Sequence, residues 1–222
     1  MNNTVRLKKG IVTAILAALS IVLYVIGPKF PLPAIFPSFL SVNFSMVPIF
    51  IALLTMGYKS GLVIVFIRFL FKLMSTSTAG IGETADLIIG LILILFTSLG
   101  YFLFKSKGKY IPMFLFAIIG WILGGVLSNV FALPMYIKVM GFTPETFASM
   151  LSSIHPACTV DNYIFYYFVY AIIPFNALLA GVVAIVTYFV WLPLHKYTDD
   201  FFGKKMKNSD KNENLDDSKS YL

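Results

Sequence analysis

The chain has 222 residues, of which 59% are hydrophobic and 12% are charged, and its formal net charge is +7. The mean hydropathy is +0.86, which excludes a soluble globular protein because a soluble domain of this size needs far more polar surface. The composition therefore indicates an integral membrane protein.

Apolar runs near or above the length of a membrane span recur along the chain. Backbone groups in lipid must pair within their own segment, and the runs do not alternate as barrel strands do, so we expect helices. The predicted fold is an all-α integral membrane protein with six transmembrane helices. Their expected ranges are 11–27, 44–57, 60–74, 83–104, 110–132 and 162–194.

The first predicted element is a cytoplasmic N-terminal arm over residues 1–10. Arg6, Lys8 and Lys9 precede an apolar run, which is the charge pattern of a signal peptide. The run is long and no small-residue cleavage site follows it, so we expect a retained first span. Within that span Ala14 and Ala18 form a small-xxx-small pattern, which lets another helix approach closely.

The predicted outer loop over 28–43 is rich in proline and aromatic residues, and Asn43 precedes the second span. Long apolar loops on the outer side predict a pocket that opens outward. In the third span, Arg68 and Lys72 are four residues apart on one helical face. We expect both to snorkel toward an interface, with pairing to the carboxylates of the next span as the alternative.

The stretch "STAGIGETAD" over residues 77–86 precedes and opens the fourth span. Glu83 and Asp86 suit a helix start because carboxylates there favour the helix dipole, and hydroxyl residues can cap the same end. A helix start does not explain Gly80 and Gly82, which permit close backbone approach. We therefore interpret this stretch, including Thr78, as the rim of a binding site.

Polar residues at the depth of the spans are costly and so indicate function. Ser128 and Asn129 end the predicted fifth span, and a long outer loop over 133–161 follows. In the sixth span Asn176 comes soon after Pro174, which frees a backbone carbonyl one turn earlier. Asn176 either receives a hydrogen-bonding ligand or joins two helices, and the sequence leaves both readings open.

Lysine and arginine residues are distributed unevenly among the predicted loops. Most lie in the N-terminal arm, the 57–61 turn, the loop before Tyr110 and the tail, whereas the opposite loops hold only Lys29 and Lys138. The positive-inside rule then places both termini in the cytoplasm. We expect a membrane domain over 11–195 and a polar, disordered cytoplasmic tail over 196–222.

Several motifs of enzymes are missing from the sequence. It has no G-x-x-x-x-G-K-[ST] phosphate loop, no H-E-x-x-H and no G-x-S-x-G. The predicted topology places His155 and His195 on opposite sides of the membrane, so they cannot share a metal ion. We therefore predict neither catalytic residues nor a metal site nor a cofactor.

The chain resembles the substrate-binding S-component of energy-coupling factor (ECF) transporters, and most of all the riboflavin-specific family. The resemblance covers nearly all of residues 8–195. It rests on four pieces: "FPLPAIFPSFLSVNFSMVP" at 30–48, "STAGIGETADLIIG" at 77–90, "ALPMYIKVMGF" at 132–142 and "AIIPFNALLAG" at 171–181.

This resemblance implies a function and partners. It implies a six-helix vitamin-binding subunit in a bacterial plasma membrane, taking up riboflavin or a related flavin from outside. The implied partners are one transmembrane coupling protein, which docks at Ala14 and Ala18, and two cytoplasmic ATPases that hydrolyse ATP. The expected ligand-binding residues are Phe39, Asn43, Phe44, Thr78, Gly80, Glu83, Asp86, Ser128, Asn129, Phe142, Asn176 and Leu179.

Three of these positions depart from the family's usual pattern. Asn43 stands where the family has Asp, Asp86 where it has Asn, and Leu179 where it commonly has a ligand-associated Lys. These departures leave two alternatives open. One is an S-component for a different vitamin, and the other is a membrane protein without a small-molecule ligand.

Overall fold

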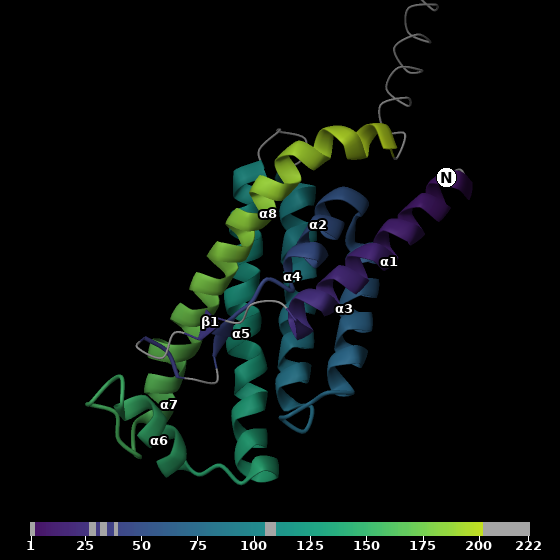
Figure 1. The fold of residues 1–222 in the computed structure, drawn as a ribbon. Coiled ribbons are helices and arrows are strands. Elements are labelled where there is room, and N and C mark those ends of the chain that lie inside the picture. The colour runs from purple at the N-terminus through teal and green to yellow at the C-terminus, as the bar shows by residue number, and fades with distance from the viewer. Residues whose placement is uncertain (1–2, 27–29, 32–34, 38–39, 105–109, 202–222) are drawn as a thin grey trace, which may run out of the picture.

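The computed structural model describes residues 3–26, 30–31, 35–37, 40–104 and 110–201. Apart from a pair of two-residue strands, the regular elements are helical (Figure 1), as the sequence predicts. The strands pair antiparallel, with Phe30 opposite Val42 and Pro31 opposite Ser41. The elements in chain order are α1 (Asn3–Val25), β1 (Phe30–Pro31), β2 (Ser41–Val42), α2 (Val47–Met56), α3 (Tyr58–Leu73), α4 (Ile81–Phe104), α5 (Tyr110–Met140), α6 (Pro144–Ser152), α7 (Tyr163–Tyr166), the π-helical η2 (Tyr167–Ile172) and α8 (Ile173–Phe201).

Within the described ranges, four helical segments are long and apolar enough to cross a membrane. They are Asn3–Val25, Ile81–Phe104, Ile111–Met140 and the continuous Tyr163–Leu194. The helix α2 has 10 residues and α3 has 16, fewer than the about 20 residues that a perpendicular helical span needs. The structure thus supports a membrane protein with four long candidate spans, and six crossings remain a prediction.

The short helix α2 forms the centre of the bundle. All ten of its residues are buried, and it packs against α1, α3 and α8. A helix that is apolar on every side can be stable only when neighbours surround it. This position explains why a helix too short to cross a bilayer is stable here.

The long helices α4, α5 and α8 run side by side (Figure 1), with α5 in contact with both of the others. Glycines let α4 and α5 approach closely. A Cβ atom added to Gly124 would lie 3.1 Å from the Cα atom of Ile89, and one added to Gly100 would lie 3.3 Å from the Cα atom of Met113. Small residues at such contacts are a common way for membrane helices to pack.

The predicted end of the fifth span is wrong. Helix α5 continues through Pro134 to Met140, eight residues beyond the expected end at 132. A proline costs a helix one backbone hydrogen bond, but the apolar residues after Pro134 continue the helix until Gly141, whose φ of +70° suits a helix end. The expected outer loop over 133–161 also contains α6, which Thr143 caps.

The last helical segment runs from α7 through η2 into α8 and reaches Phe201. Figure 1 shows the end of α8 and the start of α1 at the same end of the bundle. An even number of crossings produces this arrangement. The rest of the predicted tail, 202–222, lies outside the described residues.

Candidate functional site

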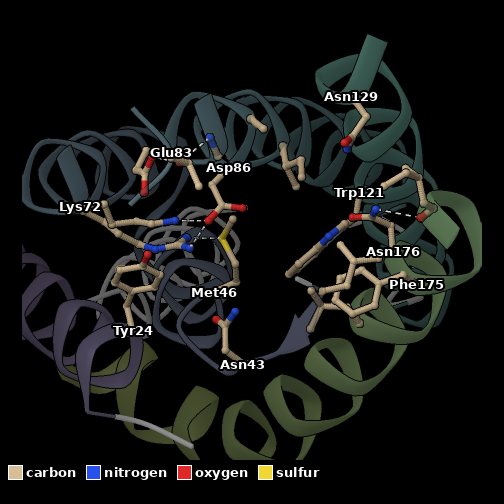
Figure 2. A pocket seen from close by; sticks show the side chains of 18 of the residues that line it. Tyr24, Asn43, Met46, Lys72, Glu83, Asp86, Trp121, Asn129, Phe175 and Asn176 are labelled. Atoms are coloured by element: carbon tan, nitrogen blue, oxygen red, sulfur yellow. Dashed lines mark hydrogen bonds and ion pairs between the residues drawn. The ribbon is translucent and has the colours of Figure 1, made fainter. Parts of the chain in front are cut away.

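A cavity of about 270 Å³ lies among α1, α3, α4, α5 and α8, beside the start of α2. Small-molecule pockets usually measure about 300–1,000 Å³, so this cavity is near the lower end of that range. Figure 2 shows two contrasting sides: Lys72 and Asp86 lie on one side, and Trp121, Phe175 and Asn176 lie on the other.

The charged side of the cavity is built from α3 and α4. Arg68 Nη2 lies 3.2 Å from Asp86 Oδ2, and Lys72 Nζ donates to the same oxygen. The side chains of Arg68 and Lys72 are 5% and 4% exposed, whereas that of Asp86 is 36% exposed. The expectation that the two cations snorkel to an interface is therefore wrong, and the alternative of pairing with a carboxylate is what the structure has.

Two further side chains stabilise the cations. Lys72 Nζ lies 4.2 Å from the centre of the Tyr24 ring, and Arg68 Cζ lies 5.8 Å from it, within the range of cation–π interactions. Arg68 Nη1 also contacts Met46 Sδ at 2.8 Å. Because charges in a low-dielectric interior need partners, these contacts explain how two basic side chains can be buried in an apolar bundle.

Glu83 lies near this group without pairing to it. Its Oε2 accepts hydrogen bonds from Thr76 Oγ1 at 2.8 Å and from Thr78 Oγ1 at 2.7 Å. Gly82 allows this arrangement, because a Cβ atom there would lie 3.1 Å from Thr78 Oγ1 and 3.3 Å from the hydroxyl of Tyr136. The segment before α4 is thus tied to the first turn of that helix at the edge of the cavity.

The opposite side of the cavity combines aromatic rings with two amides. Asn129 donates to the carbonyl of Gly125 at 2.8 Å and accepts from the hydroxyl of Tyr167 at 2.7 Å. Asn176 is 4% exposed and donates to the carbonyl of Ile172 at 2.9 Å. Asn129 thus has protein partners for both its NH₂ group and its carbonyl oxygen, whereas Asn176 Oδ1 has none among the described residues.

Seven of the expected ligand-binding residues line this cavity. They are Asn43, Thr78, Glu83, Asp86, Asn129, Asn176 and Leu179. Asn43 Oδ1 also accepts hydrogen bonds from the backbone N–H and the hydroxyl of Ser45, at 3.2 Å and 2.6 Å, so it fixes the turn that leads into α2.

The remaining expected residues lie elsewhere. Phe44 packs against the main apolar core, and Phe142 stacks on Tyr136 with ring centres 6.0 Å apart. Gly80 and Ser128 line a separate apolar groove between α4 and α5. Phe39 lies outside the described residues. Ala14 and Ala18, expected at a docking face, are exposed on α1.

Several residues of the wall were not among the expected ones. They are Tyr24, Met46, Arg68, Lys72, Trp121, Tyr136, Tyr167 and Phe175. Arg68 and Lys72 could have been recognised as site residues from the sequence, since two cations inside a span need partners. The aromatic residues could not, because aromatic side chains are common throughout a membrane sequence.

Comparisons with known proteins cover most of the chain. A family model described as "ECF transporter, substrate-specific component" matches residues 8–191. The riboflavin transporter FmnP of Bacillus subtilis (strain 168) is 27% identical over 201 residues, which cover 87% of this chain and 95% of that protein. A solved structure described as "Structure and mechanism of the S component of a bacterial ECF transporter" is 25% identical, with a TM-score of 0.62, and the match covers 86% of this chain and 98% of that one.

Proposed function

Because the chain belongs to the family of substrate-specific components of ECF transporters and is thus a transporter subunit and not an enzyme, we propose that it binds riboflavin or a related flavin. The ligand enters the cavity from outside the cell. Riboflavin specificity draws support from the similarity to a riboflavin transporter over 87% of the chain.

The composition of the cavity wall is the main evidence for this proposal. Its aromatic side, with Trp121 and Phe175, suits a flat ring system, and its polar side, with Asp86, suits a hydroxyl-bearing chain. Ligand pockets typically combine apolar walls with a few polar groups that fix orientation. The isoalloxazine ring and the ribityl chain of riboflavin have these two complementary characters.

Membership of the family implies partners in an ECF module. We propose that these are a transmembrane coupling protein, which contacts the exposed Ala14 and Ala18 of α1, and two cytoplasmic ATPases. We further propose six crossings of a bacterial plasma membrane with both termini inside. The position of both described chain ends at one end of the bundle (Figure 1) supports this topology.

A fluorescence titration tests whether the protein binds riboflavin. Ligand-free protein in detergent is titrated with riboflavin, and we expect saturable quenching of flavin fluorescence at nanomolar concentration. Asn176→Ala removes a buried polar group from the cavity and should weaken binding at least about tenfold. Asn162→Ala is the control, because Asn162 lies outside the cavity and bonds to its own loop.

A different vitamin is the second candidate. Leu179 lines the cavity at the position where the resembling riboflavin-specific proteins commonly have a lysine. An absence of quenching in folded wild-type protein would contradict the riboflavin proposal, and the same titration with other vitamins would then identify the ligand.

A further inference from the structure

The charged residues of the cavity wall differ in how far a bound molecule can reach them. Among the described residues, four charged side chains line the cavity: Arg68, Lys72, Glu83 and Asp86. The first three are at most 5% exposed, whereas the side chain of Asp86 is 36% exposed. The charge that the wall offers to a ligand is therefore mainly the negative charge of Asp86.

The carboxylate of Asp86 has two differently placed oxygens. Arg68 Nη2 and Lys72 Nζ both contact Oδ2. Figure 2 shows Asp86 between Lys72 and the open centre of the cavity, with its other oxygen pointing away from Lys72 and into the cavity. One oxygen thus holds the cations, and the other faces the space that a ligand would fill.

Further contacts keep the two cations behind this carboxylate. Arg68 Nη1 contacts Met46 Sδ at 2.8 Å, and Lys72 Nζ lies 4.2 Å from the centre of the Tyr24 ring. Since both cations are almost completely buried, an anionic group on a ligand would have to displace Asp86 before it could pair with either of them.

We propose that Asp86 is a specificity-determining residue, whose carboxylate accepts hydrogen bonds from an uncharged polyol chain and repels the same chain when it carries an anionic group. The inference rests on the proposed flavin function, in which the hydroxyl-bearing chain faces Asp86, and it adds that the cavity selects riboflavin over its 5′-phosphate. A phosphate brings negative charge and acceptor oxygens to a group that is itself a negatively charged acceptor. Placing an unfavourable charge against the wrong partner is a general source of specificity.

The ratio of two dissociation constants, for riboflavin 5′-phosphate and for riboflavin, measures this preference in a flavin fluorescence titration. A general loss of packing weakens both ligands, so the ratio reports mainly on charge. We expect the wild-type protein to bind riboflavin at least about tenfold more tightly than the phosphate. Asp86→Asn keeps a carbonyl oxygen for the cations but removes the negative charge, so it should abolish or reverse the preference.

Two matched variants remove one negative charge elsewhere. Asp161→Asn, on an exposed loop, should keep the wild-type ratio. Glu83→Gln changes a carboxylate that is 5% exposed and already accepts from Thr76 and Thr78, so it should lower the ratio less than Asp86→Asn does. An equal effect of Glu83→Gln would show that the summed charge decides and would overturn the inference, as would a ratio for Asp86→Asn within about twofold of wild type.

A second measurement needs no variant of Asp86. Two riboflavin analogues carry a carboxylate or a carboxamide in place of the terminal CH₂OH group, so they are nearly equal in size and differ in charge. Wild-type protein should bind the carboxamide at least about tenfold more tightly. Equal binding of the two, or tighter binding of the carboxylate, contradicts charge selection by Asp86 alone. Wild-type protein that binds no flavin contradicts the proposed function itself, and the inference with it.

Discussion

Gly125 and Asn176 are in direct contact between α5 and α8. A Cβ atom added to Gly125 would lie 2.6 Å from Asn176 Nδ2 and 2.7 Å from Asn176 Oδ1. The absence of a side chain at 125 therefore creates the space in which the amide lies, and the carbonyl of Ile172 then fixes its orientation.

Gly125→Ala should displace Asn176 and weaken riboflavin binding by at least tenfold. Gly181→Ala is the matched control, because an added Cβ at this position of α8 has no atom within 4 Å. Alanine is the better helix former by about 1 kcal/mol, so the control should bind normally and be no less stable. Equilibrium titration with riboflavin measures the difference, and equal affinity of the two variants would contradict the assigned position of Asn176.

Asp86→Ala should destabilise the protein, because it leaves the two buried cations of α3 without their carboxylate. Breaking a buried ion pair costs about 3–5 kcal/mol, and we expect the lower end because Asp86 is partly open to the cavity. Asp161→Ala, on an exposed loop, should change the midpoint of thermal unfolding little.

The double variant Lys72→Met/Asp86→Ala separates charge from packing. It has one unpaired cation fewer than Asp86→Ala, so its unfolding midpoint should be higher than that of the single variant. Lys72→Met alone keeps the pair between Arg68 and Asp86 and should be milder than Asp86→Ala. A double variant less stable than Asp86→Ala would show that Lys72 stabilises the bundle by packing and not by its charge.

Replacing Ala14 or Ala18 by leucine should prevent close approach of another helix to α1 while leaving flavin binding intact. Both residues are exposed on α1 and neither lines the cavity. Ile15→Leu is the control, because it introduces the same leucine side chain at a neighbouring position that is 60% exposed without adding volume to the surface of α1. Co-purification with the ECF coupling protein should fail for the alanine variants only, and retention by all three would contradict a docking face at these residues.

Cys158 should react slowly with maleimides at neutral pH. It is the single cysteine of the chain, it is 5% exposed, and burial raises the pKa of its thiol. Because the thiolate is the reactive form, a raised pKa lowers the reactive fraction at pH 7, and the rate should increase as the pH rises.

Ser153→Cys in a Cys158→Ser background tests the topology. Residue 153 is exposed, so the new cysteine should react faster than Cys158, and it should react with reagents added outside intact cells. Labelling only after permeabilisation would contradict the topology.

The sequence predicted the long helices better than it predicted their ends. Helix α4 spans Ile81–Phe104, against an expected 83–104, because a long apolar run is enough to define it. The continuation of α5 was missed, since Pro134 reads as a helix end unless the packing around it is known. Sequence periodicity also does not show that α2 is enclosed on all sides.

The site residues likewise divide into those that the sequence could indicate and those that only the packing of the helices reveals. Polar residues in apolar surroundings, such as Asp86 and Asn176, could be selected from the sequence because such groups are costly in a membrane. The pairing of Arg68 and Lys72 with one carboxylate oxygen depends on the rotation of α3 against α4. Trp121 resembles any other membrane tryptophan until its position in the wall of the cavity is known.

Flavin binding in this cavity is tested most directly by the visible absorption spectrum of the protein purified from cells supplied with riboflavin. We expect a flavin spectrum that remains after desalting, with one flavin per chain and less flavin in Asn176→Ala. A folded protein that is colourless, and stays colourless after incubation with excess riboflavin and desalting, would contradict the claim that this cavity binds a flavin.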